Sequence, residues 1–209
     1  MLRKQGGMPM RKEDKTQRTR QRILTASIEE FGRNGYRRGS INAISASGIN
    51  KGLIYHNFKD KDDLYLACVK RSLDDMVTSI QEAMQDSAVD YSTARLRFFA
   101  EHEAEARLFL ESTVSPPDHL KNEIQTLRQP LEQLNRAEFQ KILEQQTLRK
   151  GISLEDAYRW FAYMEVAFNL SFGQYDSPEE DFQTRLNKHE TSAAALIDRI
   201  LYGIAEKKE

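Results

Sequence analysis

The sequence predicts an all-α protein, and two observations support this prediction. Apolar residues recur three and four positions apart over most of the chain, which is the spacing of one face of an α-helix. Glycine and proline interrupt this spacing at Gly35, Gly48, Pro116–Pro117, Pro130 and Gly151, where helices are expected to end. We therefore expect about nine helices.

Composition excludes several classes of protein. The chain of 209 residues is long enough to bury a core, and 30% of its residues are charged. It has no run of 18 apolar residues and no apolar stretch after its basic start, so we expect neither a membrane span nor a secretory signal. The single cysteine, Cys68, cannot form an intramolecular disulfide. We expect Cys68 to be a buried hydrophobe rather than a reactive thiol, and the protein to be cytoplasmic.

The two parts of the chain carry opposite charge. Residues 1–59 contain 13 Lys and Arg against four acidic residues, a net charge of +9. The remainder contains 18 against 28, a net charge of −10. A basic segment joined to an acidic body is typical of proteins that bind a polyanion, although a run of charge is more often only solvated.

The chain is expected to begin with a flexible basic arm over residues 1–14, where glycine and proline stand among charges. Such an arm could contact DNA, but a solubilising tail is the favoured alternative. The first helix is predicted to begin between Lys15 and Thr19 and to end at Asn34, with Gly35 as a left-handed cap. Its buried stripe comprises Ile23, Leu24, Ser27, Ile28 and Phe31.

Residues 40–61 contain two short helical patterns separated by Gly48-Ile49-Asn50, the outline of a helix-turn-helix. Ser40 and Asn50 are expected to cap the two helices, and Gly48 permits the positive φ of the turn. The residues predicted to face inward are Ile44, Ile49, Ile54 and Phe58. The outer surface of the second helix is then free to enter the major groove of DNA.

A fourth helix follows, with Asp62 and Asp63 in its first turn, and no glycine or proline linker separates it from the helix-turn-helix. Further helices are predicted over residues 92–112, from after a break at residues 115–118 to Arg128, over residues 131–150 and over residues 154–175. A ninth is predicted to open at residues 177–180, with Ser177 as N-cap and Pro178 at the first position. Residues 154–175 carry apolar side chains on two faces, and one of these faces could belong to a partner chain.

The sequence contains no catalytic constellation. It lacks a glycine-rich phosphate loop, an HExxH motif, paired cysteines and a nucleophile elbow. Its four histidines have no metal-ligand spacing, so we expect no enzyme activity, metal or cofactor. Glu165, among apolar neighbours, is the most informative carboxylate because burying it without a partner is costly. It could bind a ligand cation or hydroxyl, but a salt bridge or an interfacial hydrogen bond is the favoured alternative, and His102 calls for the same caution.

Three segments carry a family resemblance: RILTASIEEFGRNGY, SINAISASGINKG and LIYHNFKDKDDLY. From Arg22 to about Lys70 the chain resembles the DNA-binding domain of the tetracycline-repressor (TetR) family of transcriptional regulators. Ser45 and Ser47 stand where that family usually has alanine, and Leu53 stands where a small polar residue is common.

The resemblance implies which residues contact DNA. They are Ser40, Lys51, Gly52, Leu53, Tyr55, His56 and Lys59. Cations and hydroxyl donors at a helix start suit phosphate anchoring, and Leu53 could contact a thymine methyl group. Tyr55 could instead pack against the first helix, and His56 could simply be exposed.

The resemblance also implies a domain plan and a function. Residues 15–60 would form the helix-turn-helix domain and residues 61–209 a ligand-binding and dimerisation domain. The expected protein is a repressor that binds a palindromic double-stranded DNA operator as a homodimer, formed through the last two helices, and that a small-molecule effector releases. Candidate pocket residues are Met76, Phe98, Phe99, His102, Phe109, Trp160, Glu165 and Phe168. The rival hypotheses are an effector-independent DNA-binding or structural factor and a helical enzyme with a degenerate helix-turn-helix.

Overall fold

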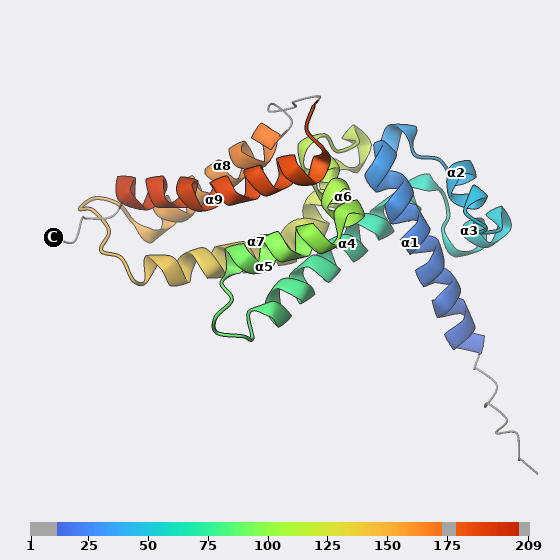
Figure 1. Ribbon diagram of the computed structural model, residues 1–209, viewed down its shortest axis with the longest axis horizontal. Helices are drawn as coiled ribbons and strands as arrows, with labels where there is room; N and C mark the ends of the chain where they lie inside the picture. The colour runs from blue at the N-terminus through green and yellow to red at the C-terminus, as the bar shows by residue number, and fades with distance from the viewer. Residues whose placement is uncertain (1–11, 173–178, 205–209) are drawn as a thin grey trace, which may run out of the picture.

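The computed structural model describes residues 12–172 and 179–204, and the regular elements in these ranges are helices (Figure 1). In chain order they are α1 (Lys12–Arg38), α2 (Ile41–Ala46), α3 (Lys51–Asn57), α4 (Lys61–Ala83), α5 (Tyr91–Glu101), α6 (Glu103–Val114), the 3-10 turn η1 (Asp118–Leu120), α7 (Lys121–Leu143), α8 (Leu154–Ser171) and α9 (Phe182–Ile204). The predicted all-α fold is confirmed. None of these helices is long and apolar enough to cross a membrane.

The helices form two groups along the longest axis of the molecule (Figure 1). Helices α1, α2 and α3 lie at one end, and we call them the reader. Helices α8 and α9 run beside each other, and α5 and α7 lie between them and α4. Helix α4 begins beside α3 and passes into the second group, which we call the body.

The reader is held by the apolar residues that the sequence predicted to face inward. Ile44, Ile49, Ile54 and Phe58 are each no more than 8% exposed, and the predicted stripe of α1 is equally buried. Helix α1 continues past the predicted end at Asn34 to Arg38, but it kinks at Gly35, where φ is 67° and ψ is 174°. Gly35 thus has the left-handed φ that was predicted for it, and one more helical turn follows it.

The predicted single helix over residues 92–112 is wrong. The structure divides it into α5 and α6 at His102, whose φ of −130° and ψ of 63° are not helical. The chain changes direction at this break, and Phe98, Phe99, Ala106 and Phe109 all join one core. No glycine or proline marks this break, because tertiary packing and not local propensity sets it.

The predicted break at Pro130 is also wrong, because α7 continues through it from Lys121 to Leu143. Pro130 lies on the exposed side of α7, whereas Ile124, Leu131 and Phe139 are buried on the other side. Burial of this long apolar face offsets the hydrogen bond that proline removes, a cost of about 3 kcal/mol. Ser177 and Pro178 lie outside the described residues, and α9 opens at Phe182 with Asp181 accepting a hydrogen bond from the Thr184 amide at 2.9 Å.

One apolar core runs from the reader into the body, and α4 is its common wall. Leu64, Val69, Leu73, Met76 and Ile80 are buried along successive turns of α4. Cys68 is fully buried among them, as predicted, and burial raises the pKa of its thiol. A smaller second core around Phe139, Leu143 and Ala157 joins the far ends of α7 and α8.

Candidate nucleic-acid interface and ligand pocket

Two side chains cap the short helices of the reader as the sequence predicted. The Ser40 hydroxyl accepts a hydrogen bond from the Ala43 amide at 3.1 Å, and the Asn50 carboxamide oxygen accepts one from the Gly52 amide at 2.7 Å. A Cβ atom added at Gly52 would lie 3.0 Å from that Asn50 oxygen. Gly52 therefore leaves room for the cap, a structural role in addition to the predicted close approach to DNA.

Ser45 and Ser47, which stand where the TetR family usually has alanine, both make hydrogen bonds in the turn between α2 and α3. Ser45 donates its hydroxyl to the Ile49 carbonyl at 2.8 Å, and Ser47 donates to the Ile44 carbonyl at 2.7 Å. Gly48, between them, has the predicted positive φ, at 90°. Both hydroxyls thus satisfy carbonyl groups of the turn, and the serines are compatible with it.

Helix α3 presents an exposed face made of residues predicted to contact DNA. Leu53 is 45% exposed and Tyr55 is 51% exposed, while Lys51, His56 and Lys59 are also exposed. Ile54 and Phe58, on the opposite side, are each 1% exposed. Tyr55 therefore does not pack into the reader core, and the predicted contact residues other than the capping Ser40 share one solvent-facing surface.

Cations hold this surface in place at both ends. Lys51 donates to the Asn42 side chain at 2.9 Å, which links the start of α3 to α2. Arg20 of α1 donates to the Asn57 carbonyl at 2.9 Å, and its guanidinium lies 4.2 Å from the centroid of the Phe58 ring. The Arg20 charge thus sits at the C-terminal end of α3, where the helix dipole favours a cation.

The reader meets the body at a polar junction that the sequence did not reveal. Glu111 of α6 accepts hydrogen bonds from the Tyr36 amide, at 3.0 Å, and from the Tyr65 hydroxyl. Asp62 accepts one from the Tyr36 hydroxyl and lies 3.1 Å from Nε2 of His119. Burial and the adjacent Asp62 carboxylate raise the pKa of Tyr36 to about 12. The junction therefore ties α1 and α4 to α6 and η1.

Helix α1 also approaches α6 closely. A Cβ atom added at Gly32 would lie 2.5 Å from the backbone oxygen of Ala104. No side chain fits at Gly32 unless the two helices separate.

The predicted pocket residues do not line one common pocket in the structure. Met76, Phe98, Phe99 and Phe109 lie in the packed core, each no more than 3% exposed. His102 is half-buried at the break between α5 and α6, and Trp160 is 40% exposed on the outside of α8. Glu165 and Phe168 alone among the eight line the pocket described next.

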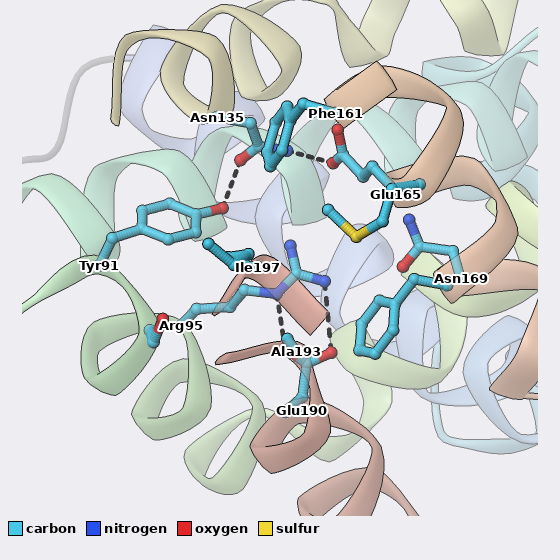
Figure 2. A pocket seen from close by; sticks show the side chains of 12 residues that line it. Tyr91, Arg95, Asn135, Phe161, Glu165, Asn169, Glu190, Ala193 and Ile197 are labelled. Carbon is cyan, nitrogen blue, oxygen red and sulfur yellow. Dashed lines mark hydrogen bonds and ion pairs between the residues drawn. The ribbon is translucent and has the colours of Figure 1, made fainter. Parts of the chain in front are cut away.

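This pocket lies between α5, α7, α8 and α9 (Figure 2). Its apolar lining comprises Phe161, Met164, Phe168, Ala193 and Ile197. Its polar lining comprises Tyr91, Ser92, Arg95, Asn135, Glu165, Asn169 and Glu190. An apolar pocket with a few converging polar groups is the usual form of a small-molecule site.

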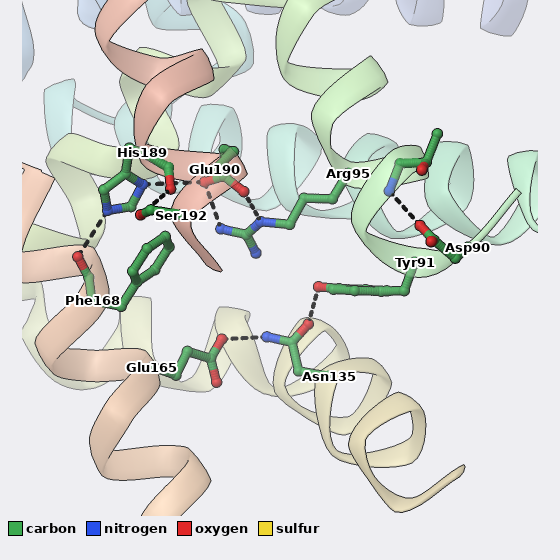
Figure 3. Close-up of polar contacts among 10 residues, drawn as sticks. Asp90, Tyr91, Arg95, Asn135, Glu165, Phe168, His189, Glu190 and Ser192 are labelled. Atoms are coloured by element: carbon green, nitrogen blue, oxygen red, sulfur yellow. Dashed lines mark hydrogen bonds and ion pairs between the residues drawn. The ribbon is translucent and has the colours of Figure 1, made fainter. Parts of the chain in front are cut away.

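Arg95 and Glu190 form a buried ion pair across the pocket (Figure 3). Arg95 Nε donates to one Glu190 oxygen at 2.6 Å, and a terminal guanidinium nitrogen donates to the other at 3.3 Å. Burial alone would raise the pKa of Glu190, but Arg95 and His189 together hold that pKa below its ordinary value. Nε2 of His189 donates to the Phe168 carbonyl at 2.8 Å, which joins α9 to α8.

A second polar chain crosses the pocket from α5 to α8 (Figure 3). The Tyr91 hydroxyl donates to the Asn135 carboxamide oxygen, and the Asn135 amide donates to Oε1 of Glu165. Burial raises the pKa of Glu165. The positive charges of Arg95 and Arg128 and the hydrogen bond from Asn135 lower this pKa, but burial has the larger effect. The sequence pointed to Glu165 alone, because the partners of these side chains lie 30 to 95 positions away in the chain.

Helix α8 carries a row of large apolar side chains on its outer face. Trp160, Tyr163, Val166 and Leu170 are 40%, 66%, 54% and 44% exposed, and they follow one another three and four positions apart. Tyr202 of α9 is 57% exposed. In the described chain this face has no covering element.

Residues 23–68 match the family described as bacterial regulatory proteins, tetR family. The reader and the start of α4 are therefore similar in sequence to this family over about a fifth of the chain. The matched residues extend from the buried stripe of α1 through α3 to Cys68 in α4, in agreement with the resemblance seen over Arg22 to about Lys70.

Curated HTH-type transcriptional regulators match part of the chain. The chain is 28% identical over 100 residues to the HTH-type transcriptional activator FasR of Mycolicibacterium smegmatis, covering 44% of this chain and 46% of FasR. It is 32% identical over 102 residues to an HTH-type transcriptional regulator of Staphylococcus aureus strain MRSA252, covering 46% of this chain and 54% of that protein. The chain thus spans about half the length of the curated relatives it matches. These relatives are regulators and not enzymes, as expected.

Solved structures share the whole fold at low identity. FadR from Bacillus subtilis, in complex with stearoyl-CoA, has a TM-score of 0.66 at 15% identity, covering 88% of this chain and 98% of FadR. SmeT, the repressor of the Stenotrophomonas maltophilia multidrug efflux pump SmeDEF, has a TM-score of 0.60 at 18% identity, covering 92% and 93%. The likeness of fold to these two solved structures therefore extends beyond the reader into the body.

Proposed function

We propose that this protein is a transcriptional repressor that binds a palindromic DNA operator as a homodimer and leaves it when a small molecule occupies the body pocket. The observation that carries the proposal is the exposed face of α3, where Lys51, Leu53, Tyr55, His56 and Lys59 surround a helix anchored by buried Ile54 and Phe58. A short helix presented in this way can lie in the major groove of DNA.

The charge distribution supports the same orientation. The basic first 59 residues would lie against the phosphates, and the acidic body would be held away from them. Lys51 is the first residue of α3 and Lys59 lies two residues after its end, a placement that suits two separate phosphate contacts. Leu53, between them, is placed for an apolar base contact such as a thymine methyl.

The exposed apolar row of α8 supports the homodimer. A row formed by Trp160, Tyr163, Val166 and Leu170 is unfavourable in water and is suited to packing against a second copy of the same helix. Helix α9 would complete a four-helix interface. A two-fold dimer presents two copies of α3, so the operator should have half-sites separated by one turn of DNA, about 34 Å.

The pocket supports control by a ligand. It lies between α8 and α9, the proposed dimer helices, and α5 and α7, which pack against α4. A ligand that binds one arrangement of these helices more tightly shifts the population toward it. If that arrangement holds the two readers at the wrong spacing, the ligand releases the operator.

The DNA-binding proposal is tested with an operator selected from a random DNA pool. Lys51→Ala and Lys59→Ala should each weaken binding and lower the slope of log K against log salt by about 0.9, the effect of one lost phosphate contact. Lys150→Ala is the matched control, because Lys150 is exposed far from α3. Unchanged affinity and slope in both reader variants would refute the assignment of α3.

The dimer and the direction of regulation need separate measurements. Tyr163→Glu combined with Val166→Glu should yield monomers by light scattering and lose operator affinity, with unchanged helical circular dichroism. A reporter gene behind the operator should be silenced by the wild-type protein. Higher expression in the presence of the protein would mark an activator, and an operator occupancy that no small molecule alters would favour an effector-independent factor.

A further inference from the structure

Asn169 holds two polar atoms that the folded chain does not use. Its side chain is 1% exposed, yet neither Nδ2 nor Oδ1 has a hydrogen-bond partner among the residues that the structure describes. Asn169 lines the pocket, and Figure 2 shows its amide turned toward the space between Glu165 and Arg95. Buried polar groups are nearly always paired in folded proteins. The amide therefore indicates a ligand that makes hydrogen bonds here.

Glu165 offers a second unused atom one helical turn away. Its Oε1 accepts a hydrogen bond from Asn135, whereas its Oε2 has no hydrogen bond within the described ranges. Burial already disfavours the charged carboxylate, as the raised pKa shows. A cation beside Oε2 would relieve that cost, since an opposite charge in a desolvated site favours ionisation of the carboxylate.

The other charges around the pocket are already paired. Arg95 and Glu190 satisfy each other through two hydrogen bonds. Arg128 Nε lies 3.7 Å from a Glu132 carboxylate oxygen, an ion pair without a hydrogen bond. The formal charges of Arg95, Arg128, Glu132, Glu165 and Glu190 sum to −1, and Glu165 is the carboxylate of this group for which the described residues form no direct ion pair, although Arg95 and Arg128 both lower its pKa.

The remaining lining suits an apolar body. Phe161, Met164, Phe168 and Ile197 provide most of the surface between the two polar positions. Phe161 and Phe168 stack on Phe139 and His189, which leaves one face of each ring to attract a ligand cation. An anion would be repelled by the Glu165 carboxylate and by the aromatic ring faces.

We propose that the pocket binds a small organic cation, a protonated amine on an aryl or alkyl body, whose N–H groups donate to Glu165 and to Oδ1 of Asn169. A hydroxyl or carbonyl group elsewhere on the ligand accepts from Nδ2 of Asn169. This assignment rests on the proposed function, which makes this pocket the effector site, and it names the chemical class that the site selects.

The test uses three probes of one shape and different charge: 3-phenylpropylamine, 3-phenylpropanamide and 3-phenylpropanoate. Each is titrated by calorimetry into the full-length protein without DNA. The amine should bind with a Kd of about 1 mM or tighter, and at least about tenfold more tightly than the amide or the acid. Glu165→Gln should remove the tenfold preference, and Asn169→Leu should weaken amine binding. Glu155→Gln, on the exposed side of α8, should change neither.

Several results would overturn the assignment. They are binding of the acid or the amide as tight as that of the amine, an unchanged preference in Glu165→Gln, and no amine binding at about 10 mM, far above the expected Kd. Circular dichroism and a thermal melt of each variant show whether it has folded. Operator binding is measured separately. Amine binding without release of DNA would support the ligand class and refute the effector role of the pocket. Release of DNA by an anion alone would support an effector role and refute the ligand class.

Discussion

Breaking the ion pair between Arg95 and Glu190 should destabilise the protein strongly. The two side chains are only 10% and 4% exposed, and they join α5 to α9 across 95 positions of sequence. Glu190→Gln leaves the buried guanidinium without its counter-charge, which costs about 3–5 kcal/mol. For a chain of this length each kcal/mol lowers Tm by about 2–4 °C, so Tm should fall by about 6–20 °C. The measurement is a thermal melt at fixed protein concentration, because the proposed dimerisation would make Tm concentration-dependent.

Two further measurements test whether the loss of stability comes from the unpaired charge rather than from a change at a buried position. The double variant Arg95→Met with Glu190→Leu removes both charges and should recover most of the lost stability. The pKa of Glu190 is depressed in the folded state, so the stability it contributes is present above the unfolded pKa and is lost as the pH falls through the lower folded value. Stability of the wild type relative to Glu190→Gln should therefore shrink below about pH 4.5. A loss under about 1 kcal/mol in Glu190→Gln, typical of an exposed pair, would refute the reasoning.

Three more predictions concern single side chains. The pKa of Glu165 is raised in the folded state, so its charged carboxylate costs stability, and that stability is recovered below the unfolded pKa. Glu165→Gln should therefore be more stable than the wild type at pH 7. The difference in stability should vanish in acid, as denaturant melts at both pH values will show. Asn50→Ala removes the cap of α3 and should cost about 1 kcal/mol, together with operator affinity, whereas exposed Asn122→Ala on α7 should change neither. Gly32→Ala forces α1 away from Ala104 and should cost about 1–3 kcal/mol by denaturant melt, and an unchanged stability would show that the helices slide apart freely.

Local signals predicted the reader well. Ile44, Ile49, Ile54 and Phe58 are buried as expected because the helix-turn-helix is short and its inward residues are set by spacing within about 20 positions. Ser40, Asn50 and Gly48 act through bonds to neighbours three residues away or fewer, or through their own φ, so their roles could be read directly from the sequence. DNA contacts of the exposed residues stay a prediction.

The body could be predicted only as a set of helices. His102 breaks a helix without a proline or glycine, and Pro130 fails to break one, because in both places packing across the core outweighs local preference. Aromatic periodicity placed Phe98 and Phe109 in a pocket, but such stripes mark the core more often than a cavity. Arg95 could have been noticed as a charge flanked by Ala94, Phe98 and Phe99 at helical spacing, yet nothing in the sequence pairs it with Glu190.

The arrangement of contacts bears on how a ligand could move the reader. No α4 residue lines the pocket, so a ligand would act on α4 through α5 and α7, which pack against it. The reader is also held from the other side, because Glu111 of α6 accepts hydrogen bonds from Tyr36 and from Tyr65 of α4. Gly32 brings α1 into close contact with the same helix. With α1 and α4 both fixed to α6, a shift of α4 alone would break the junction at Glu111. The reader and the first turns of α4 would therefore move with α6 as one rigid unit, and the separation of the two readers would change through rotation of that unit.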